Sequence, residues 1–218
     1  MKKSKIKLVS IDGDGCLFAY TNIGSQFHSS WDALGFAYGF KEVWDERGKI
    51  YYKDKDANKK WALEDSADMK GLHSHQAHKV LYPIPYSLGV TEFLAATKGK
   101  LVRGLLSGCI DMVGKKAAEE HAMDFCFCNT LPRENDIFLG TCDYAVPTWE
   151  KHSFIPKLCE KYGVTPDEIC HVGDHENDIS CFEQVGVAVA FNPKKEEVGK
   201  KAHHIIKDFR ELNGILRI

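Results

Sequence analysis

Two aspartates separated by a single glycine, Asp12 and Asp14, directly follow a short apolar run from Ile6 to Ile11. Two carboxylates on one loop can divide the work of a reaction, because one can attack a phosphorus atom while the other transfers a proton, and both can contact one hard cation. Aspartate and glycine are also ordinary turn residues, so an acidic turn after an edge strand has the same local sequence. Residues further along the chain decide between these interpretations.

A hydroxyl and a glycine follow a second predicted strand, which runs from Leu101 to Leu106. Ser107 and Gly108 come shortly before a predicted helix from Asp111 to His121, where a hydroxyl and backbone N–H groups can surround a phosphate oxygen. Serine and glycine also form plain strand-to-helix turns. The pair therefore supports a phosphate site only in combination with other motifs.

A lysine with a possible electrostatic role, Lys151, comes shortly before a predicted helix from Phe154 to Tyr162. Its ammonium could balance the charges of a phosphate and of carboxylates, although a solvated surface lysine is the ordinary alternative. Pro156 is compatible with this helix if the helix starts at Ser153, because N–H groups in a first turn have no helical partner.

A second acidic segment, Gly173-Asp174-His175-Glu176-Asn177-Asp178, follows a predicted strand from Ile169 to Val172. Asp174 would present its carboxylate at the loop, with Asp178 one helical turn later. Acidic residues at a helix N-terminus are common because they favour the helix dipole. The combination of Gly-Asp with Asn177-Asp178 at a strand end is rarer than that explanation predicts.

These charges imply a divalent cation. An aspartate attacking a phosphate dianion at about 3.5 Å meets a repulsion on the order of 9 kcal/mol at an effective dielectric of about 20. Clustered carboxylates without a cation would also raise one another's pKa values. A cation shared by Asp12, Asp174 and a phosphate oxygen would offset most of this repulsion. The sequence therefore predicts Mg²⁺, or another hard divalent ion, in the site.

From about Ser87 onward, short apolar runs alternate with helical patterns, which predicts an α/β fold with a doubly wound, Rossmann-like parallel sheet. Further strands are expected at Phe125–Cys128, Val187–Ala190 and His204–Ile206, and a further helix at Asp178–Val185. In such a sheet a ligand binds outside the carboxyl ends of the strands, which is where the acidic motifs are expected to lie.

Residues 16–86 interrupt this alternation with three of the four tryptophans and with Lys/Asp-rich segments such as residues 53–56. We interpret them as an inserted, mainly helical cap domain, and residues 1–15 and 87–218 as the catalytic core. The polar, turn-rich stretch from Leu131 to Val146 predicts a β-hairpin flap.

Composition excludes several classes of protein. The chain has 218 residues and a formal net charge of −2, which gives no electrostatic argument for binding nucleic acid or an anionic membrane. No apolar run reaches the length of a membrane span or of a signal peptide, so we expect a cytoplasmic protein in which the eight cysteines are buried thiols. Three closely spaced histidines (His73, His75 and His78) could bind zinc but fit a polar cap surface better. Nothing in the sequence predicts the oligomeric state.

Taken together, these residues resemble the four motifs of the haloacid dehalogenase superfamily of phosphatases, in the same order. The motifs are Asp12-Gly13-Asp14-Gly15, Ser107-Gly108, Lys151, and Gly173-Asp174 with Asn177-Asp178. A cap between the first two motifs is typical of its phosphoserine-phosphatase-like members. Two positions differ from the usual pattern, with Gly13 in place of a bulkier residue and Cys16 in place of Thr or Val.

The resemblance implies a role for each motif. Asp12 would be the nucleophile that forms an aspartyl-phosphate, and Asp14 the general acid and then the general base. Mg²⁺ would be held by the Asp12 side chain, the Asp14 backbone carbonyl and Asp174. The remaining residues would hold the phosphoryl group or support the metal and phosphate shell, and these are Ser107, Gly108, Lys151, Asn177 and Asp178.

The substrate implied is a small phosphomonoester other than phosphoserine. Phosphoserine phosphatases hold the substrate amino group with a glutamate shortly after the first motif and the carboxylate with an arginine of the cap. Here the segment from Leu17 to Gly24 contains no acid, and Arg47 is the only arginine in the cap. Two alternatives stay open: a phosphotransferase or mutase on the same fold, and a non-enzymatic receiver-type phosphoacceptor. A receiver accepts phosphate at a later strand, and the strand before Asn129 ends without an acid.

Overall fold

A computed structural model of the chain describes residues 5–52, 54 and 56–218, so the start of the expected core, residues 1–4, and two lysines of the cap lie outside the described residues. The core is a six-stranded parallel sheet in the order β3-β2-β1-β6-β7-β8. Its strands are β1 (Leu8–Ile11), β2 (Val102–Ile110), β3 (Phe125–Asn129), β6 (Ile169–Gly173), β7 (Val187–Phe191) and β8 (His204–Ile206). The predicted doubly wound α/β fold is confirmed.

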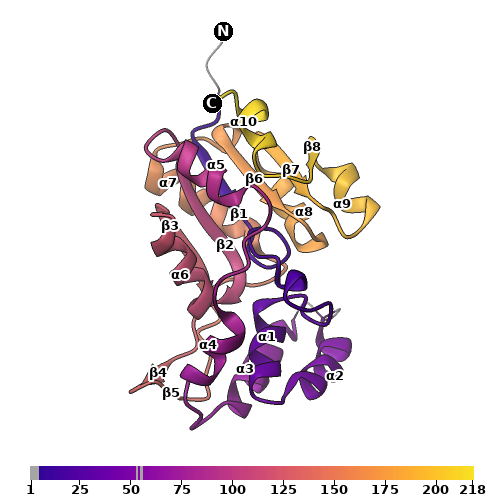
Figure 1. Cartoon of the computed structure of the whole chain (residues 1–218). Coiled ribbons are helices and arrows are strands. Elements are labelled where there is room, and N and C mark those ends of the chain that lie inside the picture. The colour runs from indigo at the N-terminus through magenta and orange to yellow at the C-terminus, as the bar shows by residue number, and fades with distance from the viewer. Residues whose placement is uncertain (1–4, 53, 55) are drawn as a thin grey trace.

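The strand order places a topological switch point between β1 and β6. From β1 the chain builds outward through β2 and β3, and then returns to the other side of β1 to build β6, β7 and β8 (Figure 1). The loops after β1 and β6 therefore diverge at their carboxyl ends, which opens a crevice there. Asp12 follows β1 and Asp174 follows β6, so both aspartates lie at this crevice.

Helices cover both faces of the sheet, as the apolar pattern of the strands requires. Val9 and Ile11 face one layer, to which α5, α6 and α10 contribute, whereas Leu8 faces the layer of α7, α8 and α9. The bounds of these helices are α5 (Val90–Thr97), α6 (Asp111–Glu120), α7 (Phe154–Tyr162), α8 (Ile179–Phe182), α9 (Glu196–Lys201) and α10 (Glu211–Leu216).

Two elements differ in length from the sequence prediction. Strand β2 continues to Ile110, so Ser107 and Gly108 lie inside the strand and not after it; a register shift between Leu106 and Ile110 marks an irregular pairing with β3 at this point. Helix α8 covers only Ile179–Phe182, because the chain before it forms a 3₁₀ turn from Glu176 to Asp178. Both differences depend on contacts with remote segments, which local periodicity does not report.

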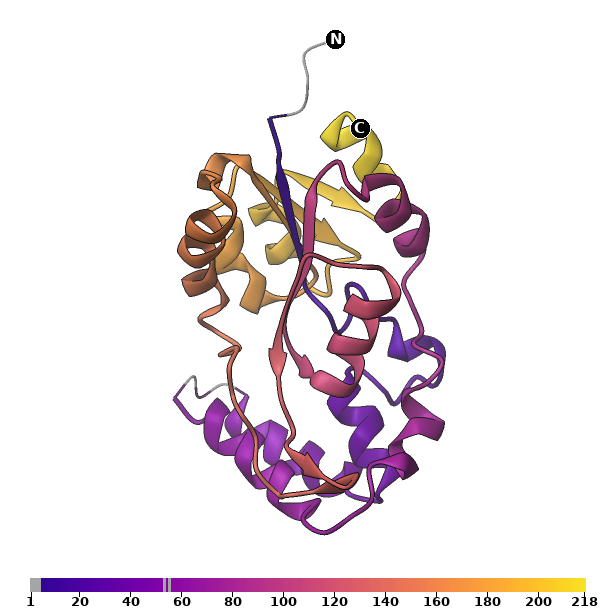
Figure 2. The same ribbon diagram turned by 90° about the vertical axis from the view of Figure 1, so that its left-hand side faces the viewer.

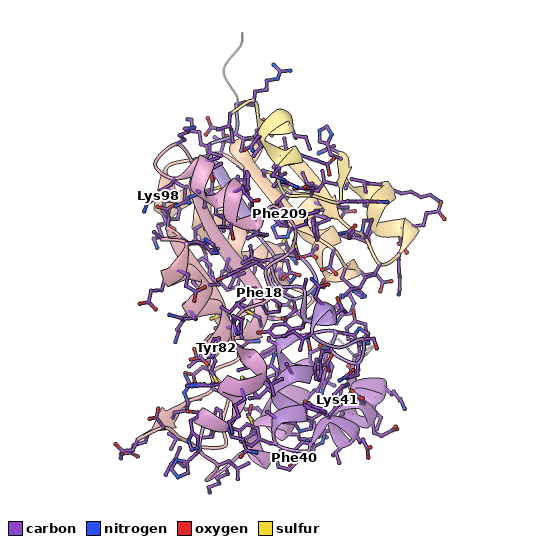
Figure 3. The ribbon with its side chains drawn as sticks, in the orientation of Figure 1. Phe18, Phe40, Lys41, Tyr82, Lys98 and Phe209 are labelled. Carbon is purple, nitrogen blue, oxygen red and sulfur yellow. The ribbon has the colours of Figure 1, made fainter. Side chains whose placement is uncertain are left out.

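In its described residues, the insert that precedes α5 contains four α-helices, α1 (Ser30–Ala37), α2 (Lys41–Tyr51), α3 (Asn58–Asp68) and α4 (His75–Leu81). In two views they gather at the end of the molecule where the β1 loop emerges, away from α10 and the C-terminus (Figures 1 and 2). Phe18 lies at the junction between the two parts, and Phe40 lies at the far end of the insert (Figure 3).

The predicted hairpin is present as β4 (Arg133–Glu134) and β5 (Ile137–Phe138). It reaches the insert, where the Phe138 carbonyl accepts a bond from Gly71 N–H at 2.9 Å and the Phe138 N–H donates to Leu72 at 3.0 Å. The hairpin thus joins a late segment of the chain to the helical insert. In the described residues no helix is long and apolar enough to cross a bilayer.

Candidate active site

The carboxylates of Asp12, Asp174 and Asp178 converge at the carboxyl ends of β1 and β6. One oxygen from each lies within 4.8 Å of the others, and all three residues are buried. The loop after β1 is held to β6 by the Asp12 N–H, which donates to the Val172 carbonyl at 2.9 Å. The parallel register of the two strands therefore brings together side chains that are more than 160 residues apart in the sequence.

Lys151 supplies the positive charge in this cluster. It lies in a 3₁₀ turn (Lys151–Ser153) before α7, is only 1% exposed, and places Nζ 2.9 Å from Asp12 Oδ1 and 2.7 Å from Asp178 Oδ1. Burial by itself lowers the pKa of the ammonium, but the charges of Asp12 and Asp178 outweigh burial and raise the pKa. Lys151 therefore stays charged and bridges the two carboxylates. Pro156 sits in the first turn of α7, as expected.

Asp178 is held by four donors. Its Oδ1 meets Lys151 at 2.7 Å and His171 Nε2 at 3.2 Å, and its Oδ2 accepts the N–H groups of Asp174 at 3.1 Å and His175 at 3.2 Å. Burial tends to raise the pKa of this carboxyl, but Lys151 and His171 lower it below its usual value. Since both oxygens are occupied by donors, Asp178 is suited to orienting its neighbours and not to binding a metal.

Gly173 is required by the position of the Asp178 side chain. A Cβ at residue 173 would lie 2.3 Å from the Asp178 carboxyl carbon and 2.4 Å from Oδ2, closer than any ordinary contact. The glycine is therefore needed for space, since its absence would push the carboxylate off the Asp174 and His175 N–H groups.

We predict that Gly173→Ala lowers both stability and activity, because the methyl group must displace a buried carboxylate and its four donors. The expected loss is about 1–3 kcal/mol of unfolding free energy, the usual cost of overpacking. The matched control is Gly214→Ala in α10, where a Cβ meets nothing within 4 Å. That change should be neutral or stabilising, because alanine favours a helix. Urea unfolding of both variants measures the difference, and equal stability of the two would contradict this prediction.

Asp174 has the features of a ligand for a hard cation. Its side chain is only 1% exposed, and its Oδ1 has no hydrogen-bond partner. Burial raises the pKa of this carboxyl to about 7. A buried carboxylate oxygen without a donor, beside the oxygens of Asp12, fits an oxygen-preferring divalent ion such as Mg²⁺.

Lys194 is a contact that the sequence interpretation did not include. Its Nζ lies 3.0 Å from Asp174 Oδ2, and a Cβ at Gly15 would come within 2.8 Å of it. Lys194 comes three residues after the end of β7, and this position near a strand end is the feature of the sequence that could have identified it.

The side chain of Asp14 turns toward the insert. Its two oxygens accept from the Ser30 N–H and the Ser30 hydroxyl, each at 2.8 Å, at the start of α1. Burial raises the pKa of Asp14 to about 7, although the bonds from Ser30 act in the opposite direction. The Asp14 carboxyl is therefore protonated in part of the molecules near neutral pH. A group that donates a proton at that pH has to be protonated in this way. Nothing in the sequence marks Ser30 as its partner.

Ser107 and Gly108 lie beside the first acidic loop. A Cβ at Gly13 would come within 2.7 Å of Ser107 Oγ and 3.1 Å of the Phe18 ring, so the unusual glycine leaves room for both. The Gly108 carbonyl accepts Trp31 Nε1 from α1 at 3.0 Å and Asn129 Nδ2 from β3 at 3.1 Å. The irregular part of β2 thus contacts the acidic loop, the insert and β3.

A cavity of about 1400 Å³ joins these residues to the helical insert. Most of the predicted site residues line it, and Asn177 does so with a buried Oδ1 that has no hydrogen-bond partner. The residues brought together at its base are Asp12, Asp14, Ser107, Gly108, Asp174 and Asn177, with Lys151 and Asp178 in contact behind them.

The three closely spaced histidines lie at the start of α4, with His73 just before the helix and His75 and His78 within it, and all three are exposed. In the described part of the chain, the group of three potential metal ligands is the aspartate cluster. The eight cysteines are free thiols.

Comparisons with known proteins agree with this geometry. Residues 136–218 match a family model described as haloacid dehalogenase-like hydrolase. The chain is 27% identical to a phosphoserine phosphatase of Archaeoglobus fulgidus over 152 residues, which cover 68% of this chain and 42% of that protein. It is 26% identical to a phosphoserine phosphatase of Methanocaldococcus jannaschii over 151 residues, which cover 68% and 71% respectively. The match thus spans less than half of the first relative.

Solved structures share the fold over the whole chain. A phospho-aspartyl intermediate analogue of phosphoserine phosphatase superposes with a TM-score of 0.80 and 23% identity, covering 99% of this chain and 100% of that one. A haloacid dehalogenase family hydrolase from Salmonella enterica superposes with a TM-score of 0.81 and 19% identity, covering 98% and 72%. Residues 136–218 are therefore similar to haloacid dehalogenase-like hydrolases, and the chain as a whole has the fold of phosphoserine phosphatase.

Proposed function

We propose that this protein is a Mg²⁺-dependent phosphatase that hydrolyses a small phosphomonoester through an aspartyl-phosphate on Asp12. The observation that carries the proposal is the contact of Lys151 with Asp12 Oδ1 at 2.9 Å, beside an Asp174 carboxylate with an unpartnered oxygen. The Lys151 ammonium lies against the carboxylate that would attack phosphorus and balances its negative charge. Relatives named phosphoserine phosphatase support the same reaction class.

The proposed reaction has two steps. In the first, a carboxylate oxygen of Asp12 forms a bond to phosphorus, the ester P–O bond breaks, and Asp14 gives its proton to the departing alkoxide. In the second, Asp14 takes a proton from water, which attacks phosphorus and releases inorganic phosphate and the Asp12 carboxylate. The same residue acts as acid and then as base, which suits a carboxyl whose pKa is raised to about 7.

The residues around Asp12 would bind the metal ion, bind the phosphoryl group and hold Asp12 in position. Asp12, the Asp14 backbone carbonyl and Asp174 would hold Mg²⁺, which when bound supplies positive charge that offsets the repulsion between carboxylate and phosphate. Ser107, Gly108 and Asn177 line the cavity and would hold phosphoryl oxygens. Lys151 and Asp178 would keep Asp12 and the Asp174 loop in place.

The substrate is proposed to be a phosphomonoester other than phosphoserine. Arg47, the insert's only arginine, is bound to Asp65 at 2.9 Å and to Asp68, and it does not line the cavity. After the first motif, Phe18 and Tyr20 are buried in the core. Neither position therefore offers a charge to the carboxylate or the amino group of an amino acid.

The helical insert is proposed to act as a cap that selects the leaving group. Residues 16–86 provide much of the cavity lining, including Trp31, Trp44 and Trp61, and the hairpin β4–β5 is bonded to the same part of the molecule. Indole faces suit an apolar or planar group better than a small charged one. We therefore expect the preferred substrate to carry a bulkier leaving group than serine.

The proposal is tested by incubating purified protein with Mg²⁺ and a panel of phosphomonoesters. We expect phosphate release from at least one aryl or alkyl phosphate, loss of release with EDTA, and recovery when Mg²⁺ is restored. Phosphoserine should be hydrolysed slowly in comparison with the best substrate of the panel. Hydrolysis that EDTA leaves unchanged, or no release from any member, would contradict the proposal.

The same assay separates the two alternatives. A phosphotransferase or mutase would transfer the phosphoryl group to an added alcohol or sugar in preference to water. A receiver would form a stable phosphoprotein from acetyl phosphate without turnover. The carboxyl end of β3 argues against the second alternative, because Asn129 there accepts the Val146 N–H at 2.9 Å through Oδ1 and donates to Gly108 through Nδ2, and offers no acid.

Asp14→Asn should slow hydrolysis about 10²- to 10⁴-fold, which is the usual contribution of general acid–base catalysis. The loss should be larger with an alkyl phosphate than with nitrophenyl phosphate, because nitrophenolate leaves without needing a proton. Steady-state rates with both substrates measure this difference. An equal loss with the two substrates would show that Asp14 does not protonate the leaving group.

A further inference from the structure

A buried histidine with no place in the motifs lies directly below the aspartate cluster. His171 is in the middle of β6, is fully buried, and is paired in register with Ser10 of β1. Its Nδ1 lies 3.2 Å from Ser10 Oγ. An imidazole in the interior of a parallel sheet is costly unless both ring nitrogens have partners. The partner of the second ring nitrogen therefore indicates the role of His171.

The second ring nitrogen points to the site. His171 Nε2 lies 3.2 Å from Asp178 Oδ1, the same oxygen that Lys151 contacts at 2.7 Å. The ring also packs against Phe182 of α8, with centroids 5.9 Å apart. Packing on one side and hydrogen bonds at both nitrogens leave the ring a single orientation.

We propose that His171 is a positioning residue of the active site, which donates Nε2–H to Asp178 and thereby fixes the carboxylate that holds Lys151 and the Asp174 loop. Ser10 completes the arrangement, because its hydroxyl donates to Nδ1 and so keeps the proton on Nε2. A chain of contacts then runs from Ser10 through His171, Asp178 and Lys151 to Asp12. The turnover readout of this proposal depends on the proposed phosphatase function, whereas its metal-binding and spectroscopic readouts do not.

A matched pair of substitutions separates positioning from packing. In His171→Gln the amide nitrogen can replace Nε2 and still reach Asp178, whereas in His171→Asn it replaces Nδ1 and reaches only Ser10. Loss of a residue that orients a metal site's ligands typically costs 10- to 100-fold in activity or metal affinity. We therefore expect His171→Asn to lower kcat and weaken Mg²⁺ binding by that factor, and His171→Gln to stay within about threefold of the original protein.

Three measurements decide the result: kcat and KM on the best panel substrate, the Mg²⁺ Kd by calorimetry, and Tm. A positioning role is supported if His171→Gln keeps the kcat and Mg²⁺ affinity that His171→Asn loses while the two variants have a similar Tm. Equal loss in both variants, tracking Tm, would overturn the proposal in favour of a packing role. The proposal would also be overturned if both variants had the kcat and Mg²⁺ Kd of the unsubstituted protein.

The unsubstituted protein offers a test that does not depend on whether the variants fold. A ¹⁵N-resolved NMR spectrum of the histidine rings should show a proton on His171 Nε2 and none on Nδ1, and Ser10→Ala should perturb that signal. A proton found only on Nδ1 would exclude donation to Asp178 and refute the proposal. If no phosphomonoester is hydrolysed, the proposed function fails, and the Mg²⁺ Kd and the NMR signal still test His171.

Discussion

Asp12→Asn should abolish phosphate release, with a loss of at least about 10⁴-fold, because an amide is not a nucleophile toward phosphorus. The substitution preserves the size of the side chain. It removes one negative charge next to Lys151, whose Nζ lies 2.9 Å from Asp12 Oδ1. Phosphate release from the best panel substrate measures the effect, and mass spectrometry of acid-quenched protein should detect the phosphorylated intermediate only in the original chain.

The matched control is Asp167→Asn. Asp167 does not line the cavity, and its exposed carboxylate contacts Lys5 at 3.0 Å. This substitution should leave kcat within about twofold, because exposed ion pairs contribute little. If Asp12→Asn kept near-normal turnover, Asp12 would not be the nucleophile and the proposed reaction would be wrong.

Lys151→Met should have the largest effect on stability. The substitution leaves the carboxylates of Asp12 and Asp178 buried without the ammonium between them, and breaking a buried pair in this way typically costs 3–5 kcal/mol. Activity should fall about 10²-fold in the fraction that stays folded, the usual cost of misplacing a reacting group by about 1 Å, because Asp12 loses the ammonium that holds it in place. Urea unfolding and the rate per folded molecule measure the two effects separately.

Lys98→Met is the control for this substitution. Lys98 is exposed and lies at the core end of the molecule, away from the helical insert (Figure 3). A surface substitution of this kind should change stability by less than about 0.5 kcal/mol. A similar stability of the two methionine variants would mean that the Lys151 ion pairs contribute nothing net to the fold.

The contact of Asp14 with Ser30 gives the insert a direct connection to the proposed chemistry. The acid is held by the first turn of α1, while Trp31 in the same turn is bonded to Gly108 in β2. Any movement of α1 relative to the sheet would therefore change the environment of Asp14. Under the proposed function, the same helix would therefore contact both the leaving group and the residue that protonates it.

The local sequence determined the main chemical features of the protein. Strand β1 followed by Asp12 and Asp14, and β6 followed by Asp174, are each a single apolar run with a polar loop, and such patterns depend only on neighbouring residues. The alternation of strands and helices was sufficient to predict the parallel sheet, and the carboxyl ends of its strands then predicted that the acidic loops would lie together.

Tertiary structure alone decided the partners of those residues. The pairing of Asp14 with Ser30, of Asp174 with Lys194, and of Lys151 with Asp178 joins residues of separate elements, and local periodicity does not predict their distance in space. The extra length of β2 depends on pairing with β3, and the short α8 follows a 3₁₀ turn that ends at Asp178, whose carboxylate contacts Lys151. Periodicity reports the face that a residue takes, whereas burial and hydrogen-bond partners depend on which remote segments pack against it.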